Sequence, residues 1–318
     1  MSLLEERRIK QYDQPIKGID DAIPKNILIE LTNACNHKCN FCFNPKSLRK
    51  PAVIDINLMS KILEEAFDMG IKEVGFYGTG EPLLVQNITE RIAIAKKIGF
   101  EYLYLTTNGS LRDDDFWEDL VKNSGLSSIK FSINAGTKET YRKIHGKDDF
   151  DKVIHRVRFV SKLIKKIKVN CHLAVSFVAT KDSEKSYNSL SNLLKDHVDE
   201  FLLYGTNNQI GYLDNKDKKG KIVSRNYKLP CSMIFNRVHI SSEGYLTACC
   251  EDYQNYLASY DLKKLNLSKA WNGKIMNNLR KKHLNKDLKN LICESCIFGT
   301  KTDDVQPLDK KLFTPIPK

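Results

Sequence analysis

The stretch Cys35-Asn-His-Lys-Cys39-Asn-Phe-Cys42 decides the fold prediction, and it follows the apolar run ILIELT over residues 27–32. Such a run is typical of a short buried strand, so three thiols stand on a loop at a strand end. A structural zinc site normally uses four ligands with Cys-x2-Cys pairs, and the C-x3-C-x2-C spacing matches it poorly. Three thiolates on a four-iron cluster would leave one iron open for chemistry.

Strand-like and helix-like segments alternate outward from this loop as far as residue 205. The expected strands are 27–32, 73–78, 102–107, 129–134, 169–178 and 200–205, and the expected helices are 57–70, 88–99, 113–123, 137–146, 150–167 and 187–197. Short links between these steps predict an α/β fold with a parallel sheet and helices outside it. Periodicity alone does not decide whether the sheet is open or curls into a partial barrel.

Polar side chains alternate along two of the expected strands. Lys130, Ser132 and Asn134 alternate on one, and Asn170, His172 and Ser176 lie on the next. A parallel strand buried on both faces is usually apolar throughout. The pattern therefore favours an inward face that does chemistry, with polar strand ends near water as the alternative.

Composition describes a globular protein without a membrane anchor. The 318 residues are 41% hydrophobic and 28% charged, and no apolar run reaches the roughly 20 residues that span a bilayer. The first residues, MSLLEERRIKQYDQ, lack an apolar signal core, so we expect a cytoplasmic protein. Disulfides are rare in that compartment, and the nine cysteines therefore point to metal binding or catalysis.

The formal net charge of +12 is compatible with an anionic partner. The lysine clusters over 162–168 and 216–221 have no interleaved aromatic residues. We interpret the charge first as solvated surface and second as steering of an anionic small-molecule substrate, and we expect no nucleic-acid partner.

The cysteine motif after the first strand, with Phe41 before its last cysteine, resembles the radical S-adenosylmethionine (SAM) superfamily. This resemblance implies that Cys35, Cys39 and Cys42 hold a [4Fe–4S] cluster whose open iron binds SAM, with Phe41 among the cofactor contacts. An electron donor such as flavodoxin or ferredoxin would drive SAM cleavage to a 5′-deoxyadenosyl radical. The implied fold is a partial (β/α)6 barrel over roughly residues 25–210, with SAM and substrate in its lumen.

Further pieces of the family pattern follow in order. Gly78-Thr79-Gly80-Glu81-Pro82 ends the second strand and looks like the family's loop for the methionyl amino group. A carboxylate and closely approaching glycine backbone suit an ammonium. Asn108 ends the third strand, and Ser132 and Asn134 end the fourth, at positions that often contact the SAM ribose. Asn134 stands where many relatives carry Asp. Each of these motifs alone is common at strand ends, and the resemblance to the family rests on their order along the chain.

A second group of cysteines occupies the C-terminal part, around one expected helix near 267–283. The spacing Cys231-x12-Gly-x4-Cys249, followed by Cys293-x2-Cys296, resembles the SPASM and twitch extensions of the superfamily. A complete SPASM extension has more cysteines, so the resemblance implies the short form with one auxiliary [4Fe–4S] cluster. Zinc is the alternative occupant. The expected domains are an N-terminal extension 1–26, the barrel 27–211, a linker 212–230, the auxiliary cluster domain 231–300 and a tail 301–318.

Chain size and cysteine spacing look most like the twitch-type dehydrogenases of aminocyclitol antibiotic pathways. The function this resemblance implies is hydrogen abstraction from a small polar substrate, a sugar, cyclitol or similar molecule with or without a phosphate. The auxiliary cluster would help to oxidise it. No residue is singled out as proton acceptor, and Glu30 and His172 are lumen candidates only by strand alternation.

Three other functions stay open. Cys250, next to the expected ligand Cys249, would be the hydrogen donor of a radical SAM epimerase, or else a buried small hydrophobe or a ligand in a shifted register. Modification of a ribosomal peptide ranks lower, because about 26 residues before the first strand are too few for a leader-binding domain. A non-catalytic, metal-stabilised nucleic-acid-binding module is the alternative from a different class.

Overall fold

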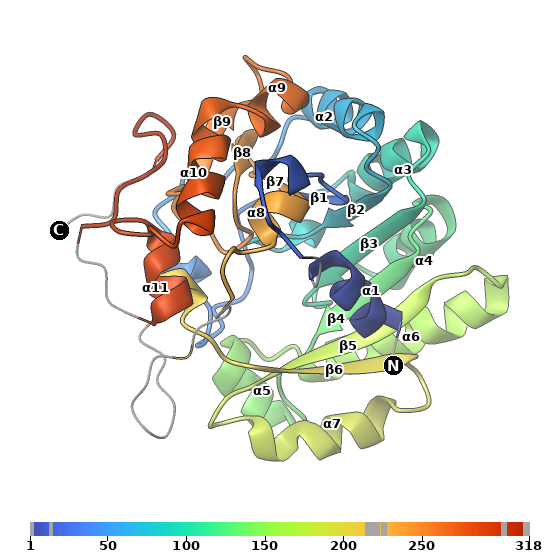
Figure 1. Ribbon diagram of the computed structural model, residues 1–318. Coiled ribbons are helices and arrows are strands. Elements are labelled where there is room, and N and C mark those ends of the chain that lie inside the picture. Colours follow the sequence, from blue (N-terminus) through green and yellow to red (C-terminus); the bar gives the residue numbers. More distant parts are fainter. Residues whose placement is uncertain (1–2, 13–14, 214–222, 224–227, 300–303, 314–318) are drawn as a thin grey trace.

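A single curved sheet of nine strands organises the chain (Figure 1). The computed structural model describes residues 3–12, 15–213, 223, 228–299 and 304–313. The strand order is β6-β5-β4-β3-β2-β1-β7-β8-β9, with parallel pairing from β6 to β7 and antiparallel pairing beyond. The strands are β1 (Asn26–Ile29), β2 (Glu73–Phe76), β3 (Tyr102–Thr107), β4 (Ser128–Ser132), β5 (His172–Ala179), β6 (Glu200–Gly205), β7 (Arg237–Ile240), β8 (Tyr245–Thr247) and β9 (Ala258–Asp261).

Helices follow the parallel strands and cover the outer face of the curve, so the sheet is a partial (β/α)6 barrel, as expected (Figure 1). They are α2 (Ile56–Asp68), α3 (Ile88–Ile98), α4 (Asp114–Asn123), α5 (Lys138–His145), α6 (Phe150–Ile167) and α7 (Tyr187–Leu194). The 3-10 turns are η1 (Ile19–Asp21), η2 (Asn44–Lys46), η3 (Pro82–Leu84), η4 (Glu184–Ser186) and η5 (Gln209–Gly211).

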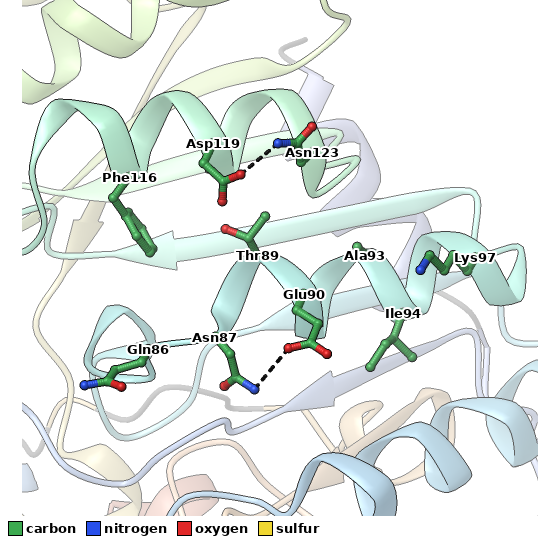
Figure 2. A pocket seen from close by; sticks show the side chains of 10 residues that line it. All are labelled: Gln86, Asn87, Thr89, Glu90, Ala93, Ile94, Lys97, Phe116, Asp119 and Asn123. Carbon is green, nitrogen blue, oxygen red and sulfur yellow. Dashed lines mark hydrogen bonds between the residues drawn. The ribbon is translucent and has the colours of Figure 1, made fainter.

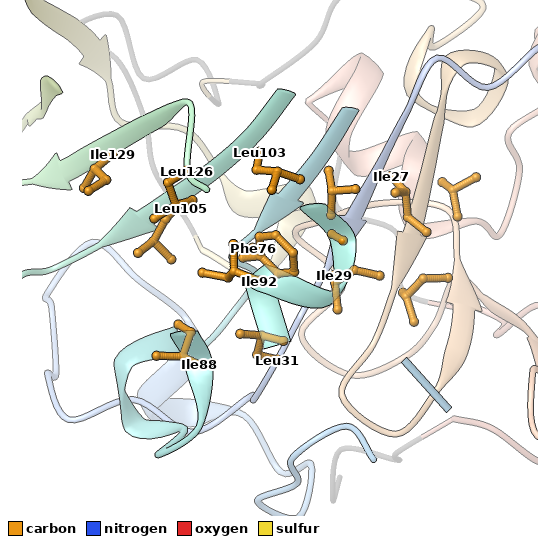
Figure 3. Packing of buried hydrophobic residues seen from close by; sticks show 14 of the residues in the cluster. Ile27, Ile29, Leu31, Phe76, Ile88, Ile92, Leu103, Leu105, Leu126 and Ile129 are labelled. Carbon is orange, nitrogen blue, oxygen red and sulfur yellow. The ribbon is translucent and has the colours of Figure 1, made fainter. Parts of the chain in front are cut away.

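The main core lies between the sheet and these outer helices. Ile29, Phe76 and Leu105 project from successive strands and meet Ile88 and Ile92 of α3 (Figure 3). All are buried, and burying each such side chain contributes about 1.5–3 kcal/mol. This packing orients the alternate residues of each strand toward the inside of the barrel.

Those inward residues are largely polar, as the alternation predicts. Thr106 pairs in register with Lys130, and Ser132 pairs with Ser176. The neighbours Phe131 and Val175 belong to the outer core. The barrel therefore has a polar lumen rather than a second hydrophobic layer.

The N-terminal helix α1 (Leu3–Tyr12) covers the end of the barrel where the strands begin. The Arg7 guanidinium lies 2.5 Å from the Glu73 carboxylate and 3.4 Å from the ring centre of Tyr102. The Leu4 N–H donates to Glu200 Oε2 at 3.1 Å. Since Glu73, Tyr102 and Glu200 each open a strand, the carboxyl ends of the strands are left for the site.

The C-terminal part adds β7 to β9 to the sheet together with short helices. They are α8 (Met233–Asn236), α9 (Leu267–Trp271), α10 (Lys274–Leu284) and α11 (Ile292–Phe298). The single helix expected near 267–283 is wrong, because the chain breaks at Asn272 and Gly273. Gly273 is the N-cap of α10, and a Cβ there would lie 2.5 Å from Tyr260 Oη. Buried Arg280 ties the two helices by donating to the Trp271 carbonyl at 2.7 Å.

The expected linker over 212–230 and tail over 301–318 lie partly outside the described residues. Within the described ranges, every helix is too short or too polar to cross a membrane.

Candidate active site

The cysteine loop leaves β1 and gathers its three thiols at the carboxyl ends of the strands. Burial, together with the nearby Glu81 carboxylate and Cys42 thiol, raises the pKa of Cys35 to about 12. Burial likewise raises the pKa of Cys39 and of Cys42. Ligation needs the thiolate form, so a bound metal cluster would supply the positive charge that these buried sulfurs lack.

The cysteine sulfurs are not gathered as the ligands of a single zinc ion would be. Sulfurs that share one tetrahedral zinc lie about 3.8 Å apart, given a Zn–S bond of about 2.3 Å. Among the described residues, no three cysteine sulfurs lie within 4.8 Å of one another. This holds for the cysteine loop and for the C-terminal cysteines alike.

The loop Gly78–Pro82 packs directly on the cysteine loop. The Glu81 N–H donates to the Ala34 carbonyl at 2.8 Å. A Cβ at Gly80 would collide with the carbonyl oxygens of Thr32 and Ala34, so glycine is required for this approach. Asn44 fastens the contact, since its Nδ2 donates to the carbonyls of Asn33 and Thr79 at 2.8 and 2.7 Å.

Glu81 is a buried carboxylate that suits the SAM ammonium. It accepts from Thr107 Oγ1 at 2.6 Å and from the Asn108 N–H at 2.7 Å. Burial raises its pKa to about 7, although these hydrogen bonds oppose the shift. Among the described residues, no basic side chain forms an ion pair with Glu81. A cationic ligand beside Cys35 would complete the site.

Asn108 links the third strand to the cysteine motif. Its Nδ2 donates to Asn36 Oδ1 at 2.9 Å, and Asn36 Nδ2 donates to Ser110 Oγ at 2.8 Å. The strand ends after β2 and β3 therefore both contact the loop that carries the three thiols. Phe41, which was also expected near the cofactor, lies in the same loop and is half-buried.

Glu30 forms part of a buried ion-pair network. Arg49 Nη2 lies 2.5 Å from Glu30 Oε2 and 2.6 Å from Glu243 Oε2. Thr79 donates to Glu30 through both its N–H and its hydroxyl. Burial alone would raise the pKa of Glu30, but Arg49 and these hydrogen bonds outweigh it and lower the pKa to about 2. A carboxylate held in this way is a poor proton acceptor.

His172, the other lumen candidate for that role, lies at the opposite end of the barrel. It is the first residue of β5, and its Nε2 lies 3.0 Å from Glu200 Oε2, beside the covering helix α1. The cysteine loop lies at the carboxyl ends of the strands. His172 is therefore remote from the gathered thiols.

Lys130 lies on the inner face of β4, opposite to its neighbour Phe131 in the outer core. Its Nζ lies 5.7 Å from the ring centre of Tyr77 and 5.9 Å from that of Tyr204. Ser132 ends the same strand one inward position further on. Asn134 beyond it is buried, with Oδ1 accepting from the Val178 N–H at 2.7 Å.

Three of the four cysteines expected to hold the auxiliary cluster, Cys231, Cys293 and Cys296, lie near one another. Cys293 and Cys296 lie three residues apart on α11 and so share a helix face. Burial raises the pKa of Cys293 well above its usual value, and the neighbouring thiols of Cys231 and Cys296 raise it further. Cys249 lies on the turn after β8, where its Sγ accepts from the Glu251 N–H at 3.5 Å.

A cavity at the mouth of the barrel joins the two halves of the site. It is small, about 20 Å³, and Gly78 and Thr79 line it together with Cys249 and Cys250, as do Glu30, Arg49, Tyr77 and His239. Aromatic residues connect the cysteine loop to the C-terminal part. Tyr253 Oη lies 3.6 Å from Cys42 Sγ, and the rings of Phe43 and Tyr212 stack with their centroids 4.4 Å apart.

A wider hollow of about 470 Å³ lies elsewhere, between α3 and α4 on the outer surface (Figure 2). Asn87 bonds Glu90 there, and Asn123 bonds Asp119. No cysteine lines it, so its chemistry is unrelated to the gathered thiols.

Two family models match the chain in the order of these halves. Residues 29–176 match the model described as the radical SAM superfamily, and residues 231–297 match the SPASM model, described as an iron–sulfur cluster-binding domain. The chain belongs to the radical SAM superfamily. Its cofactors are accordingly SAM and [4Fe–4S] clusters, and its extension is of the SPASM type.

Curated relatives share the barrel half of this radical SAM enzyme. A probable GTP 3',8-cyclase of Saccharolobus solfataricus is 34% identical over 137 residues, which is 42% of each chain. A GTP 3',8-cyclase of Aliarcobacter butzleri is 32% identical over 151 residues, 45% of each chain. The match thus spans less than half the length of these relatives.

Solved structures of radical SAM enzymes share the whole fold. BtrN in complex with AdoMet and 2-DOIA aligns with a TM-score of 0.58 at 17% identity, covering 90% of this chain and 96% of that one. Streptococcus suis SuiB bound to precursor peptide SuiA aligns with a TM-score of 0.67 at 16% identity, covering 86% and 69%. At these identities the likeness concerns the fold alone.

Several residues of the radical SAM site carry no sequence signal of their own. Asn36 and Asn44 belong to the polar surroundings of the motif, and no spacing rule marks them. Arg49 pairs with Glu243, 194 positions away, and His145 contacts Cys39 across 106 positions. Such pairs are set by the fold rather than by local pattern.

Proposed function

We propose that this protein abstracts a hydrogen atom from a small polar substrate, a sugar, cyclitol or similar molecule with or without a phosphate, and oxidises it with help from one auxiliary [4Fe–4S] cluster. Cys35, Cys39 and Cys42 hold the SAM-binding cluster, and Cys231, Cys249, Cys293 and Cys296 hold the auxiliary one. Cleavage of bound SAM, driven by an electron donor such as flavodoxin or ferredoxin, supplies the 5′-deoxyadenosyl radical.

One observation carries this proposal: the cavity at the barrel mouth is lined both by the Gly78–Thr79 loop and by Cys249 and Cys250. At about 20 Å³ the cavity has room for about one water, so it marks where the SAM side and the auxiliary side meet rather than a preformed substrate pocket. The cavity also exposes Tyr77, whose ring lies beside Lys130. A cation in the lumen supports an anionic or strongly polar substrate.

In this proposal the protein's own residues position the cofactor and substrate. Glu81 binds the SAM ammonium, while Gly78, Thr79, Gly80, Pro82 and Asn108 shape the loop around the methionyl group. Ser132 and Asn134 lie at the strand end toward the ribose, and Phe41 packs in the cluster loop. Lys130 neutralises the substrate's anionic group.

An epimerase is the second candidate, and the position of Cys250 favours it. The residue lines the same cavity as Thr79 and Glu30. A thiol there would return a hydrogen atom to the opposite face of the substrate radical, leaving its mass unchanged. GTP and peptides are further substrates to assay, because relatives are named GTP 3',8-cyclase and one neighbour is bound to a precursor peptide.

Product analysis separates these outcomes. Reconstituted enzyme is incubated anaerobically with reductant, SAM and a panel of polyols, sugar phosphates, GTP and peptides, in H2O and in D2O. The dehydrogenase forms one ketone and one 5′-deoxyadenosine for each SAM consumed. A product of unchanged mass that takes up one solvent deuterium contradicts the dehydrogenase and supports the epimerase.

Cys250→Ala sharpens the distinction. A dehydrogenase keeps its ketone yield in this variant, whereas an epimerase loses inversion while still cleaving SAM. Cys171→Ala is the matched control, because Cys171 is a buried thiol of the outer core and does not line the cavity. Full inversion by Cys250→Ala excludes Cys250 as the hydrogen donor.

A further inference from the structure

His145 contacts the cysteine motif but has no part in the proposed function. It is the last residue of α5, and 1% of its surface is exposed. Its Nδ1 lies 3.3 Å from Cys39 Sγ. The ring stacks on Tyr141 with centroids 4.1 Å apart and meets the edge of His37 at 5.3 Å. These contacts fix the ring plane with one nitrogen directed at the thiol.

The opposite nitrogen of the ring determines which one carries the proton. The Asn134 backbone N–H donates to His145 Nε2 at 3.3 Å. Asn134 Oδ1 accepts from the Val178 N–H at 2.7 Å, which turns the amide so that Nδ2 also faces Nε2 at 3.4 Å. Two donors therefore converge on Nε2, which must present its lone pair. The proton of the ring sits on Nδ1, directed at Cys39.

We propose that His145 is a positioning residue that donates an Nδ1–H hydrogen bond to the Cys39 thiolate and raises the reduction potential of the SAM-binding cluster, with Asn134 holding the ring in the required tautomer. This inference rests on the proposed role of Cys39 as a cluster ligand. Reduction adds negative charge to the cluster, and a hydrogen bond to a ligand sulfur stabilises the more negative state.

The same geometry explains the amide at position 134. A carboxylate at position 134 would accept a hydrogen bond from an Nε2–H group of His145. The ring proton would then sit on Nε2, and Nδ1 would turn its lone pair toward the Cys39 sulfur. Asparagine avoids this repulsion. Asn134 and His145 thus belong to one hydrogen-bonded chain that runs from Val178 to Cys39.

A single metal ion is the competing interpretation of this cluster. Ligand atoms of His37, Cys39 and His145 lie within 4.8 Å of one another, the one such group in the described part of the chain. Metal binding at His145 Nδ1 requires a lone pair there, which the two Asn134 donors deny. His37 Nε2 lies 3.1 Å from Asp149 Oδ2 and its Nδ1 has no hydrogen-bond partner among the described residues, so the metal interpretation fails at His145 rather than at His37.

The test is an EPR-monitored redox titration of the full-length protein reconstituted anaerobically with iron and sulfide. The signal of the SAM-binding cluster is recognised by its change when SAM is added. His145→Leu removes the donor and keeps the site apolar. His155→Leu is the matched control, because His155 lies on α6 with 61% of its side chain exposed.

We expect His145→Leu to shift the one-electron reduction equilibrium about tenfold against the reduced cluster, a fall of about 59 mV in midpoint potential. His155→Leu keeps the wild-type potential. A His145→Leu protein with full iron content and an unmoved potential overturns the proposal.

A measurement on the unaltered sequence covers the case in which His145→Leu fails to fold. Pulsed EPR of the reduced protein labelled with 15N-histidine should show a weak histidine nitrogen coupling to the SAM-responsive cluster. A reduced cluster without this coupling overturns the proposal. Failure of the proposed function looks different, since the SAM-responsive signal would then persist after Cys35, Cys39 and Cys42 are all replaced by alanine.

Discussion

At the scale of one residue, a substitution of Glu81 affects SAM binding and the stability of the fold differently. Its carboxylate is buried with a pKa raised to about 7, so the ligand-free protein carries a desolvated charge near neutral pH. In Glu81→Gln the charge disappears, but the single amide oxygen replaces only one of the two acceptors. Leu83 and Thr107 donate to Oε1 of the carboxylate, and Asn108 donates to Oε2. We expect little change in stability above pH 7, because relief of the buried charge offsets the donor left facing the amide nitrogen, and SAM binding weakened by about 1.5–3 kcal/mol through loss of the charged partner.

Equilibrium binding of SAM and urea unfolding, both without reductant, check the two halves of this prediction. Glu90→Gln is the control, since Glu90 lies on the outer surface hollow and touches no part of the site. Tight SAM binding by Glu81→Gln contradicts the assigned role.

At the scale of elements, the Gly78–Pro82 loop packs on the cysteine loop because Gly80 has no side chain. A Cβ at Gly80 meets backbone carbonyls, which cannot move aside as a side chain could. We expect Gly80→Ala to destabilise the protein by about 1–3 kcal/mol, as overpacking does, and to weaken SAM binding at least as much as Glu81→Gln.

Gly205→Ala is the matched control for this loop contact, because nothing lies within 4 Å of a Cβ at Gly205. Urea denaturation and SAM titration of the two variants make the comparison. Equal effects of the two substitutions would contradict the tight loop packing.

Sequence periodicity anticipated most elements of the barrel, and β3, α6 and β6 have the predicted bounds. These segments have clear apolar spacing and sharp ends. The C-terminal elements were harder, because β8 has three residues and β7 pairs in parallel with distant β1. The break at Gly273 depends on Tyr260, a contact that no local pattern encodes.

The same limit applies to the site. Cysteine spacing points to the ligands because they lie close in sequence. The partners that shape the site, Arg49 with Glu243 and His145 with Cys39, are brought together only by the fold. Strand alternation placed Glu30 in the lumen, and it could not reveal that Arg49 forms an ion pair with that carboxylate.

Arg49 joins the two halves of the whole molecule. It lies on the loop after the cysteine motif and pairs with Glu30 after β1 and with Glu243 between β7 and β8. Arg49→Met leaves Glu30 buried without its cation, and removing one partner of a buried pair costs about 3–5 kcal/mol. Urea unfolding at pH 7 measures this, with Lys122→Met, which breaks an exposed pair on α4, expected to cost less than about 0.5 kcal/mol.

The Glu30–Arg49 pair also predicts a pH dependence. The folded-state pKa of Glu30 is lowered to about 2 from a usual 4.5, so its stabilisation is complete above pH 4.5 and is lost as the pH falls toward 2. In Arg49→Met this part of the acid destabilisation should vanish, as denaturation midpoints between pH 5 and pH 2 would reveal. Parallel pH profiles for the variant and the unaltered protein would contradict the ion pair.

The most direct test of the account counts iron and 5′-deoxyadenosine together after anaerobic reconstitution. Two clusters predict about eight irons per chain, and replacement of Cys35, Cys39 and Cys42 by alanine should leave about four. The unaltered protein should form 5′-deoxyadenosine from SAM with dithionite, and the triple variant should form none. SAM cleavage that survives the triple replacement, or zinc in place of iron, would contradict the account.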